Sequence, residues 1–155
     1  VAGEAFDTIC DRTLRGLRGA VESCDVAWWQ STGDGSLSRA VATAGRPGAA
    51  PVAAHIVPAS VPVVVHEAGA ESPFVTALLD AEAASALIAC PVSVGPAVRG
   101  WIVVSSPEGR AWRADEVDTV AAVASALAGA LTAVESRVER EAAEAQLRQV
   151  QKMEA

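Results

Sequence analysis

Apolar positions in the last third of the chain recur in alternating steps of four and three residues. Within residues 112–155, which contain one glycine and no proline, the stripe comprises Val120, Ala124, Leu127, Leu131, Val134 and Val138. This spacing is typical of a helix that packs on another helix. After Val138 charged residues interrupt the stripe, and Leu147 and Val150 resume it off register. At ~1.5 Å per residue the helix would reach roughly 60 Å, so its second half should leave the core.

Shorter patterns precede this helix. A helical stripe over residues 4–21 predicts a first helix, and Ser72 followed by Pro73 caps a second one over residues 72–84. β-Branched and apolar runs bounded by turn residues predict five strands, over residues 25–31, 37–44, 61–66, 85–94 and 98–106.

Several details constrain how these strands are arranged. An Asp-Gly turn joins the first two strands, and Pro62 indicates that the third lies at a sheet edge. The last two strands are apolar on both faces, so we expect them to be central. Between the hairpin and the third strand, residues 45–60 are irregular, with room for a short helix at 52–57. Antiparallel hairpins with helices at each end indicate an α+β fold.

The start of the long helix carries a capping signal. Glu116 stands three residues after Arg113, at the capping-box position, and Trp112 can staple onto Val117. Arg113 is itself a poor N-cap residue, a departure from the usual pattern that the sequence does not explain.

Candidate ligand-contacting residues lie on the strands or at their ends. Trp28 and Trp29 are neighbours, so on a strand they face opposite sides of the sheet. One should enter the core, and the other belongs either to a second buried layer or to a pocket wall. His66 ends a strand, where side chains commonly reach a pocket. The full set of pocket candidates is Trp28, Trp29, His66, Cys90 and Trp101.

Composition and charge narrow the classes of function. The chain has 155 residues, enough for one core, and its formal net charge of −7 argues against a nucleic-acid or anionic-membrane partner. No uninterrupted apolar run approaches the ~20 residues of a membrane span. Cys10, Cys24 and Cys90 are scattered and lack zinc-ligand spacing, so no metal site is predicted. Such thiols fit a reducing, cytoplasmic compartment.

Residues 85–131 resemble the C-terminal half of a GAF domain. The matching features are an apolar-Pro-apolar step, a V-x-G strand, a Ser-Pro loop, an aromatic residue and an acidic helix start, at Pro91, Gly100, Ser106-Pro107, Trp112 and Asp115-Glu116. This resemblance implies a GAF/PAS-like central antiparallel sheet flanked by helices, with a long C-terminal signalling helix. It divides the chain into a GAF domain over residues 1–134 and a signalling helix over residues 135–155.

A second resemblance concerns residues 144–155, which look like the linker that enters the phosphoacceptor helix of sensor histidine kinases. It implies the sensor module of a bacterial two-component kinase, cut before the kinase core and not itself catalytic. The module would form a homodimer through its N- and C-terminal helices, and the long helix would relay a signal. A small-molecule ligand is possible, and no membrane contact is expected from this segment.

The ligand stays open at this point. The bilin-attachment and cyclic-nucleotide patterns of the family are absent, and haem would need His55 or His66. Few cations lie near the presumed cavity, so we expect either a small, mostly apolar cavity or no bound cofactor. Two other functions remain: a thiol enzyme resembling free methionine sulfoxide reductase, or a dimerising spacer without a ligand. A catalytic thiol should be partly exposed with a lowered pKa. The basic residues near that cavity are Arg39, Arg46 and Arg99.

Overall fold

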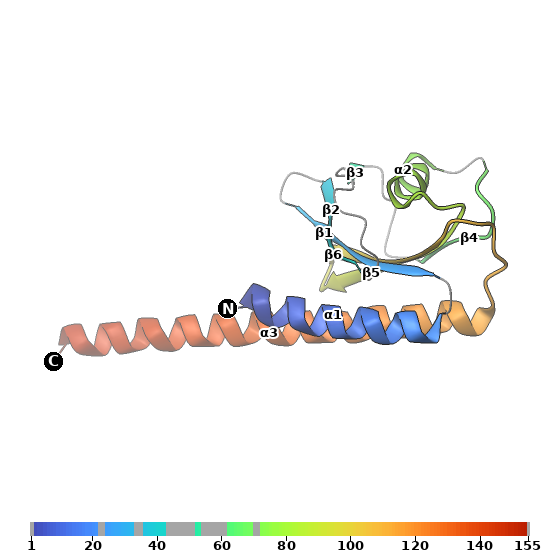
Figure 1. Cartoon of the computed structure of the whole chain (residues 1–155). Coiled ribbons are helices and arrows are strands. Elements are labelled where there is room, and N and C mark those ends of the chain that lie inside the picture. Colours follow the sequence, from blue (N-terminus) through green and yellow to red (C-terminus); the bar gives the residue numbers. More distant parts are fainter. Residues whose placement is uncertain are drawn as a thin grey trace.

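Six strands form one antiparallel sheet in the order β3-β2-β1-β6-β5-β4 (Figure 1). The computed structural model describes residues 2–21, 24–32, 36–42, 52–53, 62–69 and 72–154. The strands are β1 (Asp25–Ser31), β2 (Ser36–Ala42), β3 (Val52–Ala53), β4 (Val63–Val65), β5 (Ala86–Val94) and β6 (Ala97–Ser106). The long hairpin of β5 and β6 occupies the middle of the sheet, as its apolar sequence predicts.

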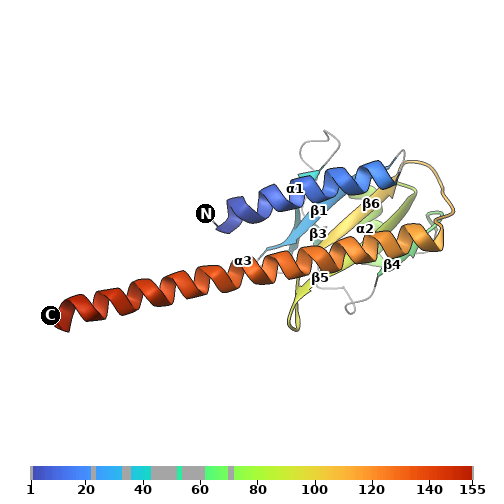
Figure 2. The same ribbon diagram turned by 90° about the horizontal axis from the view of Figure 1, so that it is seen from below.

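Two helices lie on one face of the sheet and one on the other. α1 (Ala2–Ala20) and α3 (Ala114–Glu154) run side by side in opposite directions beneath the sheet, and Figure 2 shows both in front of it. α2 (Pro73–Glu82) lies on the opposite face (Figure 1). The first half of α3 therefore belongs to the domain, while its second half extends beyond the sheet.

Side-chain alternation along the strands divides the interior into two cores. The lower core packs the inner sides of α1 and α3 against one face of β1, β5 and β6. The upper core packs α2 against the other face of the same strands. Because successive residues of a strand point to opposite faces, Trp28 enters the lower core and Trp29 the upper one. Both indoles are buried, as expected for a sheet covered on both sides.

Most predicted elements are confirmed, with boundaries that differ by one or two residues. β4 follows Pro62 directly and lies at a sheet edge, which the proline indicated. The hydroxyl of Ser72 accepts a hydrogen bond from Val75 N at 3.4 Å and caps α2, with Pro73 at the first position. The α+β assignment is likewise confirmed.

One local prediction is wrong. The pattern at residues 52–57 allows a short helix, but Val52 and Ala53 instead form β3, which pairs with Leu37 and Ser36 of β2. Backbone hydrogen bonds to an exposed strand edge outweigh weak local helix preference in so short a segment. The predicted turn at residues 33–35, together with His55 and Arg46, lies outside the described residues.

The apolar stripe of α3 packs largely within its own chain. Val120, Ala124, Leu127 and Val134 are buried within this subunit, and Leu131 is half-buried against the same lower core. The sheet and α1 of the same chain therefore cover the inward side of α3 at these positions. Only Val138, with 38% of its surface exposed, lies beyond this contact.

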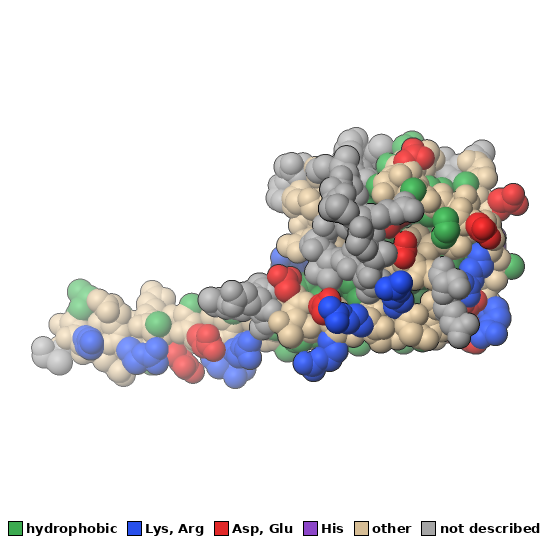
Figure 3. Space-filling view, viewed as in Figure 1, with side chains coloured by type: hydrophobic (Ala, Val, Ile, Leu, Met, Phe, Trp, Pro, Cys, Tyr) green, Lys and Arg blue, Asp and Glu red, His purple; other side chains and the backbone are tan. Residues whose placement is uncertain are grey.

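Beyond Val138 every described residue of α3 is exposed. Figure 3 shows basic and acidic side chains interspersed along this projecting half, with scattered apolar side chains between them. Leu147, Val150 and Met153 are its exposed large apolar residues. By length and composition α3 also qualifies as a membrane-spanning helix, a weak criterion that core helices of soluble proteins meet as well.

Candidate functional site

The five pocket candidates do not converge on one pocket. Trp28 and Cys90 belong to the lower core, whereas Trp29 and Trp101 belong to the upper core. His66 lies just after β4 and is exposed. The division follows from strand register, since Trp28 and Cys90 both pair with Ile102 and so share its face of the sheet.

The upper core contains a buried polar contact between the sheet and α2. Glu82, in the last turn of α2, is 4% exposed, and its Oε1 accepts a 2.7 Å hydrogen bond from Trp29 Nε1. Trp101 packs nearby against Phe74, with ring centroids 5.2 Å apart. A carboxylate in an aromatic layer is costly unless it is hydrogen-bonded, so this contact fixes α2 on the sheet.

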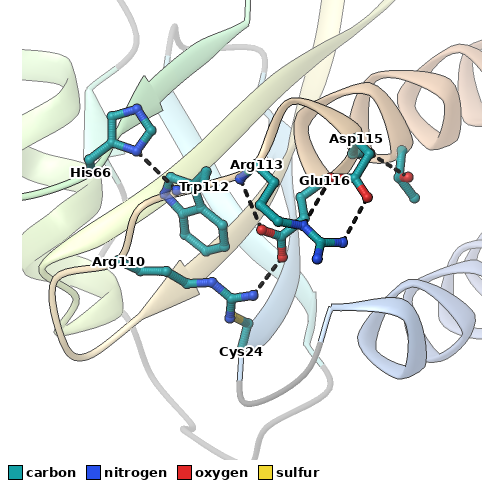
Figure 4. A network of polar contacts seen from close by, with 8 residues as sticks. Cys24, His66, Arg110, Trp112, Arg113, Asp115 and Glu116 are labelled. Carbon is teal, nitrogen blue, oxygen red and sulfur yellow. Dashed lines mark hydrogen bonds and ion pairs between the residues drawn. The ribbon is translucent and has the colours of Figure 1, made fainter.

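The start of α3 is tied to the sheet edge by a second set of contacts, shown in Figure 4. His66 Nδ1 accepts a 3.0 Å hydrogen bond from Trp112 N, and Trp112 Nε1 donates to the carbonyl of Val65 at 2.9 Å. The carbonyl of His66 also accepts from Arg110 N. Three hydrogen bonds thus join the end of β4 to Arg110 and Trp112, in the segment that leads into α3. We call this the β4–α3 junction.

Arg110 extends the junction to Cys24, just before β1, and to the start of α3. Its guanidinium lies 4.8 Å from the ring centroid of Trp112 and donates to Cys24 Sγ at 2.9 Å. It also forms an ion pair with Glu116, whose other carboxylate oxygen accepts from Arg113 N at 3.0 Å. The Glu116 half of the predicted capping box is confirmed, since its carboxylate accepts from the backbone N–H of Arg113. The other half is missing, because the arginine side chain has no acceptor for the N–H of Glu116.

Two of the pocket candidates lie in clefts on the α1 and α3 side of the sheet. One cleft has a volume of about 250 Å³ and includes Trp28 and Arg99 in its wall. The other, about 270 Å³, lies between α3 and β5 and includes Cys90 and Pro62. Arg99 is the only one of the three predicted basic residues whose side chain the structure describes, and it pairs with Glu135 at 3.4 Å. Among the described residues, no group of acidic, histidine or cysteine side chains is arranged to hold a metal ion.

All three cysteines are buried. Burial, reinforced by Asp7 and Asp11, raises the pKa of the Cys10 thiol to about 12, and burial alone raises that of Cys90 to about 11. The pKa of Cys24 is also raised by burial, which outweighs the opposing effect of Arg110. Protonated, inaccessible thiols are poor nucleophiles, so these residues do not provide the site that the thiol-enzyme alternative requires.

Sequence reasoning missed three residues with structural roles. Glu82 carried a usable signal, because Phe74, Leu78 and Glu82 are spaced four apart and share one helix face. Gly100 belongs to the V-x-G motif, but the sequence did not show why a glycine is needed there. A Cβ at this position would lie 2.3 Å from Trp28 Cη2 and 2.5 Å from the carbonyl of Trp29. Arg110 follows no periodic pattern, and only the fold reveals its partners.

The comparisons with known proteins agree with this architecture. Residues 5–131 match the GAF domain family, while no curated protein sequence matches the chain. Among solved structures, a domain assigned to a two-component sensor histidine kinase protein from Sinorhizobium meliloti is similar at 14% identity and a TM-score of 0.74, covering 88% of this chain and 98% of that one.

The blue-light absorbing form of the PixJ GAF domain from Thermosynechococcus elongatus is similar at 11% identity and a TM-score of 0.73. That match covers 92% of this chain and 94% of the other. At sequence identities this low, the two structures show only that the fold is shared. The family match spans most of the described sheet and helices, and on that ground the chain belongs to the GAF domain family.

Proposed function

We propose that this GAF domain is the sensor module of a two-component sensor histidine kinase, and that α3 relays its state to a kinase core. The observation that carries the proposal is the continuity of α3. Its first half is a structural wall of the domain, and its second half continues as the same helix with exposed Leu147, Val150 and Met153. A single amphipathic helix gains little stability in water on its own, which favours a helical partner for this half.

A second copy of the chain is the simplest such partner, because a two-fold axis along α3 aligns identical apolar positions. We place the dimer contact on α3 from Val138 onward and on the outer side of α1, where Ile9 is exposed. The stripe from Val120 to Val134 does not take part, since the lower core covers it.

The β4–α3 junction supports the relay. A displacement of β4 or of the segment after it would act on Trp112 and Arg110 through three short hydrogen bonds. Both residues lie within four positions of Ala114, the first residue of α3, so the helix start would shift with them. A signal of this kind requires a two-state element, and the projecting half, with its interrupted apolar register, supplies two packings of similar energy.

The dimer is tested by sedimentation of two matched double variants. Leu147→Glu with Val150→Glu puts charge on the proposed contact, whereas Gln146→Glu with Gln149→Glu adds the same charge at exposed neighbouring positions. We expect the first pair to sediment as a monomer and the second to remain dimeric. A monomeric parent chain, or identical behaviour of both variants, would refute dimerisation through α3.

The relay is tested by joining residue 154 to the kinase core of a sensor histidine kinase and measuring autophosphorylation. Deleting residues 142–145 removes roughly one turn and rotates the helix face, whereas deleting residues 139–145 removes about two turns and keeps the heptad phase. The first deletion should change kinase activity strongly and the second weakly. Equal effects of the two deletions would show that α3 is only a tether.

The chain's localisation and ligand follow from the same proposal. A kinase module of this type acts in the cytoplasm, on the side of the phosphoacceptor. The upper core, rich in aromatic side chains with one buried carboxylate at Glu82, favours a small, mostly apolar ligand or none. An absorbance spectrum of the purified chain tests this directly, since a visible band would reveal a haem or bilin and contradict the expectation of no such cofactor.

A further inference from the structure

The cleft that includes Trp28 lies at the point where α3 leaves the domain. α1 contributes Phe6 and Asp7 to it, and α3 contributes Leu131, Val134 and Glu135. The edge of the sheet closes it with Trp28, Gln30, Ser31 and Arg99. It therefore lies on the opposite side of the sheet from α2 and the upper core, and it is separate from any ligand held there.

Its walls combine an apolar base with charges of both signs. Phe6 meets Trp28 edge to face, with ring centroids 5.6 Å apart, and Leu131 and Val134 continue the apolar surface along α3. Arg99 and Glu135 stand at the rim as a half-exposed ion pair with a 3.4 Å separation. A solvent-screened pair at this distance opens readily, so each partner is available to a charged ligand.

Trp28, which forms part of the cleft wall, carries a polar group without an acceptor. Its Nε1 is buried and has no hydrogen-bond partner within the described part of the chain. A buried N–H without an acceptor is unfavourable and rare in native proteins. The Cη2 edge of the ring lies against Gly100, the residue next to Arg99, so a ligand held by Arg99 would lie near this ring.

We propose that this cleft binds a free amino acid with an apolar side chain. Arg99 would hold the carboxylate beside the ring of Trp28. Glu135 and Asp7 would hold the ammonium group, and the side chain would lie on Phe6, Leu131 and Val134. The volume of about 250 Å³ falls just below that of pockets for drug-sized ligands, which suits a molecule of this size.

The inference does not depend on the dimer or on the relay, because binding can be measured on the chain alone. The test is a titration of the ¹⁵N-labelled chain with L-phenylalanine and L-leucine, following the indole N–H resonances. Trp28 is identified by the resonance that disappears in Trp28→Phe. We expect its resonance to move and saturate with at least one of the two amino acids.

Analogues and variants separate the proposed contacts. Phenethylamine lacks the carboxylate and 3-phenylpropionate lacks the ammonium group, so each should bind at least tenfold more weakly than phenylalanine. Arg99→Gln and Glu135→Gln should weaken amino-acid binding to the same degree, and Arg137→Gln, on the exposed side of α3, should leave it unchanged. The proposal is overturned if neither amino acid moves the Trp28 resonance at about 10 mM. Equal binding of all three phenyl compounds would also overturn it, as would unchanged binding in both cleft variants.

Discussion

The two halves of α3 share one secondary structure but are helical for different reasons. Residues 114–134 place Val120, Ala124 and Leu127 in the lower core, so tertiary packing stabilises this half. Residues 139–154 have no such contact, and only helix propensity and local side-chain pairs act on them within the subunit. The difference separates an anchored half, which defines the domain, from a projecting half, which is free to respond to a partner.

The largest expected effect comes from removing a buried side chain of the anchored half. Leu127→Ala should lower the free energy of unfolding by about 2–5 kcal/mol, because it deletes apolar contacts and leaves a cavity under the sheet. Leu147→Ala, the same change in the projecting half, should alter it by no more than about 0.5 kcal/mol. Chemical denaturation of the parent chain and of both variants measures these changes in the free energy of unfolding. A similar loss in the two variants would show that the projecting half is packed within the subunit.

The next largest effect is expected in the sheet that covers the anchored half. Gly100→Ala places a methyl group against the ring of Trp28 and the backbone of Trp29, so we expect a loss of about 1–3 kcal/mol from overpacking. Gly129→Ala is the matched control on α3, where an added Cβ meets no atom within 4 Å. That change should raise stability by about 0.5–1 kcal/mol, since alanine is the better helix former. Thermal unfolding monitored by circular dichroism distinguishes the expected loss of stability in Gly100→Ala from the expected gain in Gly129→Ala.

Alkaline pH should loosen the lower core through its thiols. Burial raises the folded-state pKa of Cys10 to about 12 from an ordinary value of 9.0, so the folded state holds a proton that the unfolded state has lost. Stability is therefore fully present below pH 9 and falls between pH 9 and 12, by roughly 1.4 kcal/mol per pH unit for this group. The chain has no tyrosine to obscure the effect.

Denaturation series at rising pH, on the parent chain and on Cys10→Ala, measure this slope. Cys90 contributes in the same direction, so the variant should retain part of the slope and lose the rest. A parent chain whose stability is flat from pH 9 to 11 would contradict the burial of both thiols.

The smallest effect concerns the first turn of the anchored half. Glu116→Gln keeps an acceptor for Arg113 N but removes the charge that pairs with Arg110, and we expect a loss of about 1 kcal/mol. Asp115→Asn removes the neighbouring but exposed ion pair with Arg113 and should have no resolvable effect on unfolding. An equal response in the two variants would mean that the β4–α3 junction adds nothing to the capping of α3.

Much of the fold was predictable because its signals are local. The period of two in residues 25–31 places Trp28 and Trp29 on opposite faces, and Pro62 is incompatible with a central strand, so both statements held in the structure. The capping residues Ser72 and Glu116 act within one helical turn of their partners, which is why their sequence context was enough to identify them.

The sequence by itself determined which residues of α3 form one apolar stripe, and only the tertiary structure decided what covers that stripe. Helical periodicity relates residues a few positions apart, but it carries no information about whether a sheet or a second helix lies opposite. The same limit explains the pocket candidates. Alternation gives each tryptophan a face within its own strand, whereas the register that aligns Trp28 with Cys90 through Ile102 depends on contacts between distant segments.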